Sequence, residues 1–168
     1  MTLDKINTLS ERDAKTLFHL ACGSRRWSEE MVARRPFTTP ERMYAVADEI
    51  WGNLSEDDWK EAFAQHPRIG DTKEIRKKFG RASAWMLEEQ SGANHVPERI
   101  IKAIADGNAL YEAKFGFIFI VSATGKSAEE MLALLNERLN NYPAQELAIA
   151  AAEQAQITRR RLEKILKS

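Results

Sequence analysis

Cysteine is nearly absent from this sequence, since Cys22 is the only one among 168 residues. A single thiol cannot form a disulfide within the chain, which fits a reducing compartment. Neither charge is in excess, because Lys+Arg and Asp+Glu both total 25. This balance removes the general electrostatic case for a nucleic-acid or anionic-membrane partner. No apolar run reaches membrane-spanning length and the first residues lack an apolar signal core, so we expect a soluble, cytoplasmic protein.

Sequence motifs for bound metals and cofactors are also missing. The sequence has no glycine-rich phosphate loop, no zinc-ligand spacing and no G-x-S-x-G turn for a nucleophilic serine. Its three histidines, His19, His66 and His95, are scattered along the chain. The residues therefore predict no metal site, and they indicate no cofactor.

Signals for helices dominate what is present. Ser10, Thr39, Ser55 and Ser127 each stand where a side-chain oxygen can cap the start of a helix. Apolar residues at helical spacing and strong helix formers follow these caps. Helices are predicted over residues 11–22, 40–54, 56–65, 80–90, 98–115, 128–140 and 144–167.

One segment, "FGFIFIVSA" at residues 115–123, departs from this pattern. It is aromatic and β-branched without a helical period, which is typical of an extended stretch. No partner strand can be identified in the sequence, so its backbone groups need side chains, water or a ligand as partners. We therefore predict an all-α fold: a single-domain helical bundle over residues 1–168, with one short extended segment at about residues 115–123.

Three polar sites stand in unusual settings, and each has two interpretations. His66 ends a helical run just before Pro67, where it either interacts with the helix dipole or presents its imidazole to a ligand. Glu89 and Gln90 close an otherwise apolar run, and a solvated helix end is the more common outcome there. Arg161 is the last of three consecutive arginines, which usually form a basic helix face. From the residues alone the function stays open.

Four strings in a fixed order carry a family resemblance. They are "HPRIGD" at 66–71, "EQSGA" at 89–93, "YEAKFGFIFIVSATGKS" at 111–127 and "ITRRRLEKIL" at 157–166. Together they resemble the 2-oxo-4-hydroxy-4-carboxy-5-ureidoimidazoline (OHCU) decarboxylases, the last enzymes of the route from urate to (S)-allantoin. The resemblance covers nearly the whole chain. It implies an all-α carboxy-lyase that forms a homodimer, takes the small molecule OHCU as substrate and needs no cofactor.

The same resemblance assigns roles to individual residues. The family's catalytic pair falls on His66 and Glu89, and its other substrate-binding side chains fall on Pro67, Gln90 and Arg161. The segment whose backbone contacts the substrate falls on Phe119, Ile120, Val121, Ser122 and Ala123. One departure is visible.

That departure is Met86, because many relatives carry serine at this slot, three residues before the glutamate. The hydrogen bond that this serine supplies, either to the substrate or to a residue that contacts the substrate, is therefore not expected here.

The residue types suit a decarboxylation. Loss of CO2 leaves an electron pair on carbon, and in OHCU the neighbouring C=N bond can accept it without a cofactor. A histidine can act on the ring hydroxyl near neutral pH, and a glutamate can complete an acid–base pair. An arginine offers planar donors to a carboxylate or a carbonyl. The sequence does not decide whether His66 or Glu89 returns the proton to carbon.

Two other functions stay open at this point. A non-catalytic helical interaction module would leave His66 and Glu89 exposed and far apart. A hydrolase of a related ureide would need an activated water or a metal, for which the sequence shows no ligand set.

Overall fold

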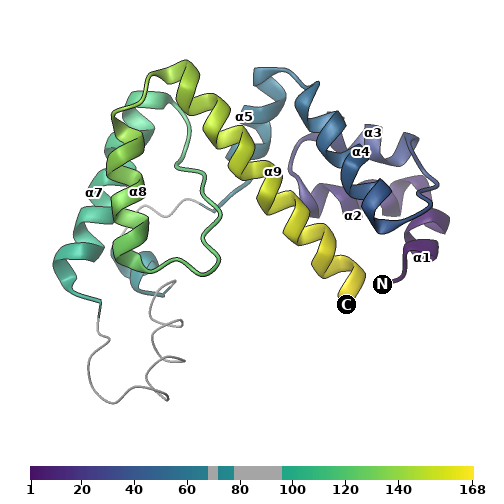
Figure 1. Cartoon of the computed structure of the whole chain (residues 1–168), viewed down its shortest axis with the longest axis horizontal. Coiled ribbons are helices and arrows are strands. Elements are labelled where there is room, and N and C mark those ends of the chain that lie inside the picture. The colour runs from purple at the N-terminus through teal and green to yellow at the C-terminus, as the bar shows by residue number, and fades with distance from the viewer. Residues whose placement is uncertain (68–71, 78–95) are drawn as a thin grey trace, which may run out of the picture. The chain divides into compact units, whose positions relative to one another are not determined.

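The fold is all-α, as predicted. A computed structural model describes residues 1–67, 72–77 and 96–168, and within these ranges no strand is present. The helices are α1 (Leu3–Thr8), α2 (Glu11–Ala21), α3 (Arg25–Ala33), α4 (Pro40–Gly52), α5 (Glu56–Ala64), α7 (Glu98–Phe115), α8 (Ala128–Leu139) and α9 (Pro143–Lys167), as shown in Figure 1. Residues 72–77 are also helical. The helix predicted over residues 80–90 lies outside the described residues.

The chain divides into two compact units. Unit 1 comprises Met1–His66 and Ile149–Ser168, and unit 2 comprises Pro67–Ala148. Helix α9 contributes its first residues to unit 2 and the remainder to unit 1. The organisation of residues 1–168 as a single domain stays a prediction.

Side-chain caps begin the helices where the sequence predicts them. Ser10 caps α2, Thr39 caps α4 and Ser127 caps α8, each by accepting a hydrogen bond from the backbone N–H three residues on. Ser55 caps α5 in a full capping box, in which the Asp58 carboxylate accepts from the Ser55 backbone N–H in return. Local sequence therefore sets these four helix starts.

Helix ends and two short helices differ from the predicted ranges. Helix α4 ends at Gly52 and α5 ends at Ala64, both earlier than predicted. Helices α1 and α3 are not among the predicted ranges, although α3 carries the same kind of cap, in which Ser24 accepts from the Trp27 N–H. Helix ends are less well defined than starts here because they depend on packing more than on a single capping residue.

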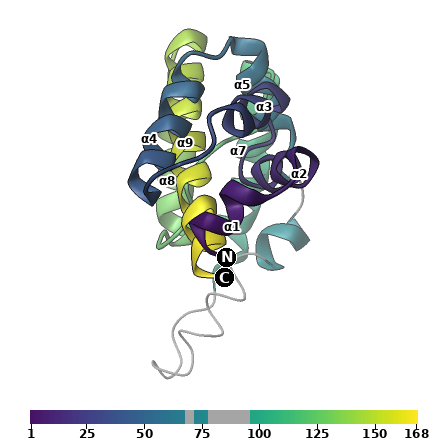
Figure 2. The same ribbon diagram turned by 90° about the vertical axis from the view of Figure 1, so that its right-hand side faces the viewer.

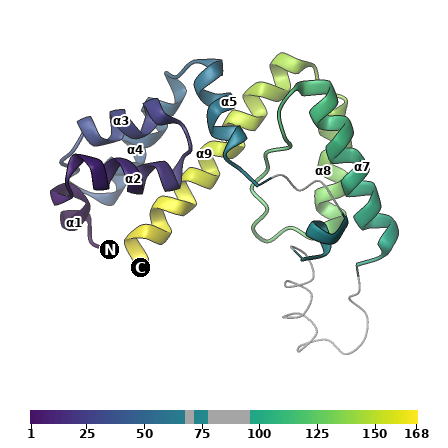
Figure 3. The same cartoon turned by 180° about the vertical axis from the view of Figure 1, so that it is seen from behind.

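Three indole N–H groups join the helices of unit 1. Trp27 on α3 donates to the carbonyl of Ala47 on α4 at 3.0 Å. Trp51 on α4 donates to the carbonyl of Ala151 on α9 at 2.9 Å. Trp59 on α5 donates to the Trp51 carbonyl at 2.9 Å. Each bond satisfies the one polar group of a large ring and links α3, α4, α5 and α9, which lie together in Figure 3.

Aromatic packing fixes the position of α5 within unit 1. The Trp51 ring centroid lies 6.0 Å from that of Trp59 and 6.5 Å from that of Phe63, and both partners are on α5. Because Trp51 also donates to α9, one side chain positions α5 and α9 against α4. His66 follows the end of α5 and is thereby brought to α9.

The two ends of the chain meet within unit 1. The ammonium group of Met1 donates to the carbonyl of Ser168 at 2.6 Å and to that of Ile165 at 3.0 Å. Figure 2 shows α1 beside the last turn of α9. A cation suits this place because the C-terminal end of a helix carries partial negative charge.

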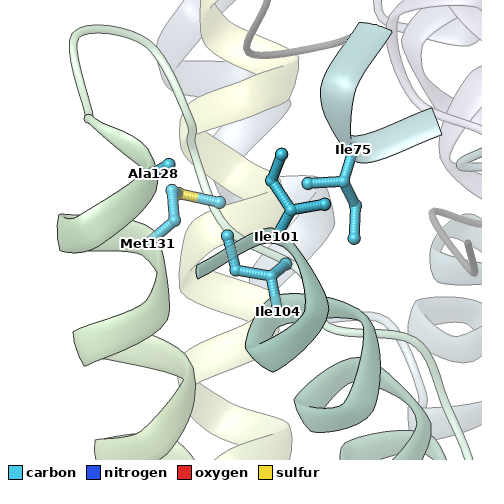
Figure 4. Close-up of a cluster of buried hydrophobic side chains, with 5 residues drawn as sticks. All are labelled: Ile75, Ile101, Ile104, Ala128 and Met131. Carbon is cyan, nitrogen blue, oxygen red and sulfur yellow. The ribbon is translucent and has the colours of Figure 1, made fainter. Parts of the chain in front are cut away.

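Unit 2 is organised around the helix pair α7 and α8. Gly107 on α7 lies so close to Leu135 on α8 that an added Cβ would come within 2.6 Å of the leucine side chain. The missing side chain therefore lets the two helices approach closely. A buried cluster joins this pair to the helical residues 72–77 through Ile75. Its members, drawn in Figure 4, are Ile75, Ile101, Ile104, Ala128 and Met131.

The predicted extended segment is present but begins later than predicted. Phe115 is the last residue of α7, and Gly116 ends that helix in the left-handed region with φ of 78°. Residues 118–123 form neither helix nor strand. Phe117 and Ile120 are buried, so the segment runs through the interior of unit 2.

Replacing Trp51 with Phe should destabilise the protein by about 1–3 kcal/mol, because it removes a buried donor and leaves the Ala151 carbonyl without that partner. Urea denaturation followed by circular dichroism measures this loss. Trp59→Phe is the matched control: it removes an indole N–H that is only half-buried, and its loss should be smaller. Equal losses of unfolding free energy would show that the hydrogen bond from Trp51 to α9 stabilises the protein no more than that of Trp59.

Candidate active site

His66 lies just beyond α5 and is hydrogen-bonded to α9. Its Nε2 lies 2.5 Å from Oε1 of Gln154. Gln154 is fully buried and His66 is half-buried. The backbone N–H of His66 also donates to the carbonyl of Phe63 at 3.2 Å, in the last turn of α5. The imidazole is therefore held in a defined orientation and is neither a freely solvated helix end nor a core side chain.

The hydrogen-bonded chain continues from Gln154 to a buried cysteine. Nε2 of Gln154 donates to Oγ1 of Thr158 at 3.2 Å, and the Thr158 side chain in turn hydrogen-bonds to the Cys22 sulfur. Burial raises the pKa of the Cys22 thiol from its usual 9.0 to about 11. The thiol is therefore protonated at neutral pH.

Arg161 lies on the same helix at the end of α2. Its Nη1 donates to the carbonyl of Ala21, the last residue of α2, at 3.3 Å. Its positive charge also reaches Cys22, where it lowers the pKa and partly offsets the effect of burial. Arg161 is half-buried rather than fully buried. The side chain is thus positioned by a helix C-terminus, which favours a cation.

The other two arginines of the run differ from each other in exposure. Arg159 is exposed, donates to Glu163 at 3.0 Å and stacks over Tyr44 with its guanidinium 3.9 Å from the ring centroid. Arg160 is half-buried, as is Arg161. Arg159 therefore lies on the surface, whereas burial does not separate Arg160 from Arg161.

In unit 2, side chains satisfy carbonyls of the extended segment. The guanidinium of Arg138 donates to the Ile120 carbonyl at 2.7 Å and stacks over Phe119 at 4.5 Å from the ring centroid. The Lys126 ammonium donates to the Ser122 carbonyl at 2.6 Å. Side chains thus supply part of the pairing that the missing partner strand would otherwise provide.

A buried ionic network holds Arg138 in place. Glu146 at the start of α9 accepts from Nε of Arg138 at 2.6 Å and from the Tyr111 hydroxyl at 2.5 Å. The amide of Asn141 donates to the second carboxylate oxygen at 3.0 Å. Burial, together with the hydrogen bond to Glu146, raises the pKa of Tyr111, so its hydroxyl stays protonated as a donor. These bonds fix the direction of the guanidinium that the extended segment uses.

The residues predicted for the site fall in both units. His66 and Arg161 belong to unit 1, where the chain through Gln154, Thr158 and Cys22 connects their surroundings. Pro67 and residues 119–123 belong to unit 2. Pro67 is exposed, Ile120 and Ser122 are buried, and the remaining positions of the segment are half-buried. Glu89, Gln90 and Met86 lie outside the described residues.

Sequence reasoning missed four polar residues that hold these groups: Gln154, Thr158, Arg138 and Glu146. The sequence carries a signal for Gln154, Thr158 and Arg138. Gln154 and Thr158 share one face of α9 with Arg161, at helical spacing. Arg138 continues the buried stripe of α8. Polar residues on an apolar stripe need buried partners, so such interruptions mark sites where internal hydrogen bonds are required.

Other surface features of the described residues do not involve the predicted site. A cleft between α1, α2 and α3 contains none of the predicted site residues; it is lined by Asn7, Glu11, Arg12, Lys15, Glu29, Val32, Ala33, Arg35 and Pro36. Within residues 1–67, 72–77 and 96–168, no group of three or more His, Cys, Asp or Glu side chains is arranged to hold a metal ion. None of the helices in those ranges is long and apolar enough to cross a membrane.

Comparison with protein families matches most of the chain to one family. The model of the OHCU decarboxylases matches residues 7–163. This range includes all of unit 2 and most of unit 1.

Three relatives are described either as uric acid degradation proteins or as an OHCU decarboxylase. The uric acid degradation bifunctional protein TTL of Arabidopsis thaliana is 40% identical over 87% of this chain and 45% of its own length. The uric acid degradation bifunctional protein of Bacillus sp. (strain TB-90) is 26% identical over 97% of this chain and 32% of its own length. An OHCU decarboxylase of Amia calva is 44% identical over 35% of this chain and 34% of its own length. The matches thus span less than half the length of each of these relatives.

Two solved structures share the fold. A crystal structure of an OHCU decarboxylase in the presence of (S)-allantoin is 34% identical, with a TM-score of 0.71, over 90% of this chain and 97% of that one. A crystal structure of an (S)-allantoin synthase is 19% identical, also with a TM-score of 0.71, over 98% of this chain and 54% of that one. At the lower identity the likeness shows the fold alone.

Replacing Arg138 with Met should destabilise the protein by about 3–5 kcal/mol, because it leaves the Glu146 carboxylate buried without its cation. Urea denaturation measures the change, and Arg99→Met, at an exposed arginine on α7, is the matched control with little expected effect. The double variant Arg138→Met/Glu146→Leu should recover part of the loss, since no unpaired buried charge remains. A single variant as stable as the control would contradict this account of the network.

Proposed function

The chain belongs to the OHCU decarboxylase family, and we propose that it decarboxylates OHCU to (S)-allantoin in urate degradation. The observation that carries the proposal is the family match over residues 7–163. The motifs that contain His66, Glu89 and Arg161 fall within that range. The names of the relatives in Arabidopsis thaliana and Amia calva, and the crystal structure with (S)-allantoin, support the same reaction.

The proposed reaction needs no electron sink other than the substrate. The bond between the hydroxyl-bearing ring carbon and its carboxylate breaks and CO2 leaves. The electron pair forms a C=C bond to the neighbouring ureido-bearing carbon, whose C=N π electrons move to nitrogen. The hydroxyl then loses its proton and becomes the ring carbonyl, while a proton reaches the ureido-bearing carbon from one face and sets the (S) configuration of allantoin. The protein has to orient the carboxylate, stabilise the developing charge and control the side from which the proton arrives.

His66 and Glu89 form the proposed acid–base pair. An imidazole changes protonation near neutral pH and can hydrogen-bond to or deprotonate the ring hydroxyl next to the carboxylate. The half-buried position of His66 and its bond to Gln154 support this role, since a catalytic base must be both oriented and reachable. Its half-burial also counts against the interaction module, which would leave His66 exposed. In this proposal Glu89 supplies the other half of the pair.

Arg161 and the extended segment are the proposed substrate-binding elements. Nη1 of Arg161 donates to Ala21, and its other donors suit a carboxylate or a ring carbonyl. The carbonyls of Ile120 and Ser122 are held by Arg138 and Lys126, so the segment between them has a fixed backbone. A fixed backbone can offer N–H and C=O groups to the ureido and ring amides of OHCU with little loss of entropy. Pro67 and Gln90 complete the proposed set.

Three further features belong to the proposal. Through the family resemblance, the proposed enzyme acts without a metal or cofactor and forms a homodimer. Its proposed location is the cytoplasm, which rests on the single cysteine and the lack of an apolar signal core in the sequence. The reaction is assayed on freshly generated OHCU by following the chirality of the allantoin formed, and EDTA in the assay should leave the rate unchanged.

Replacing His66 with Asn should leave a folded protein whose kcat falls by about 100-fold or more, because the proposed acid–base group is lost. The assay on fresh OHCU measures kcat, and circular dichroism checks the fold. His19→Asn makes the same chemical change at an exposed position on α2 and should keep full activity. A folded His66→Asn protein with the kcat of the His19→Asn control would rule out His66 as the acid–base residue.

Replacing Arg161 with Lys should lower kcat/KM by about tenfold or more, because a point charge cannot reproduce the planar donors of a guanidinium. Arg159→Lys is the matched control on the same helix, where the side chain is exposed and pairs with Glu163; its kcat/KM should change little. Equal, mild losses at both positions would instead indicate a diffuse basic surface.

A further inference from the structure

A chain of hydrogen bonds runs from His66 through unit 1 and ends on a buried sulfur. His66 bonds to Gln154, Gln154 to Thr158, and Thr158 to Cys22. Gln154 and Cys22 are fully buried, and Thr158 is 5% exposed. The two links on α9 are four residues apart, so their side chains lie one turn apart on the same face. This chain of hydrogen bonds is therefore shielded from solvent everywhere except at His66.

The hydrogen bonds of Gln154 favour one direction of donation. Nε2–H of Gln154 donates to Oγ1 of Thr158 at 3.2 Å, and the Thr158 side chain is also hydrogen-bonded to the Cys22 sulfur. The amide of Gln154 then presents its oxygen to His66. An oxygen can only accept, so Nε2 of His66 must carry a proton.

We propose that Gln154 is a positioning residue, which holds neutral His66 as the tautomer protonated on Nε2 and so places the basic lone pair on Nδ1. Thr158 fixes the amide of Gln154, and Gln154 fixes the ring. The catalytic consequence rests on the proposed role of His66 as acid–base residue, whereas the tautomer itself does not. In the proposed reaction, Nδ1 is then the atom that meets the ring hydroxyl of OHCU.

This arrangement orients the ring without adding a charge behind it. A carboxylate partner would stabilise the imidazolium and keep the base protonated to higher pH, whereas a neutral amide stabilises it less. The charged groups acting on the far end of the chain are Arg161 and Glu61, whose charges influence Cys22 in opposite directions. A neutral acceptor next to His66 thus suits a base that must be unprotonated near pH 7.

The opposite amide orientation makes the opposite prediction. If Gln154 presented its N–H to His66, the neutral ring would carry its proton on Nδ1 and its lone pair on Nε2. Long-range proton–nitrogen correlation spectra of protein labelled with nitrogen-15 histidine distinguish the two tautomers. The His66 signals are identified by their absence from the His66→Asn variant. Wild-type protein above the imidazole pKa should show the Nε2–H form, and a dominant Nδ1–H form would overturn the inference.

Variants of Gln154 then separate orientation from packing. Gln154→Leu removes the acceptor, so the two tautomers should mix and kcat should fall by about ten- to a hundredfold, as for other residues that orient a functional group. Gln156→Leu makes the same change at an exposed position of α9 and should alter neither. If Gln154→Leu kept both the single tautomer and wild-type kcat, Gln154 would not be a positioning residue.

The conservative variant Gln154→Glu retains an acceptor. It should keep the Nε2–H tautomer, raise the pKa of His66 and move the acidic limb of the kcat profile to higher pH. This shift is a readout that a purely structural role would not produce. An unchanged pH profile, with the tautomer lost as in Gln154→Leu, would contradict the inference.

Thr158→Val tests the same chain if Gln154→Leu does not fold. Valine has nearly the shape of threonine but can neither accept from Gln154 nor hydrogen-bond to Cys22, so the amide should lose its preferred direction. The share of the Nε2–H tautomer should fall, while an unchanged share would show that Thr158 does not orient Gln154.

The measurements keep the two proposals apart. A protein that does not decarboxylate OHCU would defeat the proposed function, yet its His66 tautomer would still decide the inference about Gln154. An active enzyme in which His66 is protonated on Nδ1 would defeat the inference and leave the proposed function standing.

Discussion

The hydrogen bond from Trp51 to the Ala151 carbonyl is the contact on which the arrangement of unit 1 depends. It joins α4 to α9, while the Trp51 ring packs against Trp59 and Phe63 of α5. One side chain thus joins the neighbouring helices α4 and α5 to α9, which is distant from both in sequence. Because an indole buries a large apolar area and has a single polar atom, it contributes packing energy and a fixed direction together. His66 reaches α9 only because α5 is held there.

In each unit, buried polar groups orient residues to which the family resemblance assigns a role. In unit 1 the neutral chain through Gln154 and Thr158 orients His66. In unit 2 the ion pair of Arg138 and Glu146 holds the carbonyl of Ile120. The neutral partner in unit 1 and the ionic partner in unit 2 suit the different groups that they hold. A neutral partner leaves an imidazole free to change protonation, whereas a carbonyl with no strand beside it needs a strong, directional donor.

The buried network in unit 2 explains how an extended segment persists in an all-α fold. A lone extended stretch has backbone groups that an interior normally leaves unsatisfied. Here Arg138 comes from α8 and Lys126 from the turn before it. Their side chains donate to segment carbonyls in place of the backbone N–H groups that a second strand would offer. Glu146 keeps Arg138 from turning to solvent. Such a network is costly to break on one side only, because the remaining charge stays buried.

The sequence by itself determined the helical class, the capped helix starts and, through family resemblance, the candidate residues. Caps are local, since Ser55 and Asp58 bond to each other's backbone within one turn, and apolar periodicity is equally local. Only the tertiary structure decided that Gln154 lies against His66 and that Arg138 meets Ile120. These pairs are 88 and 18 residues apart, and no local pattern specifies which polar side chains meet once helices pack. The meeting is decided by packing contacts such as that of Trp51, which exist only in the folded chain.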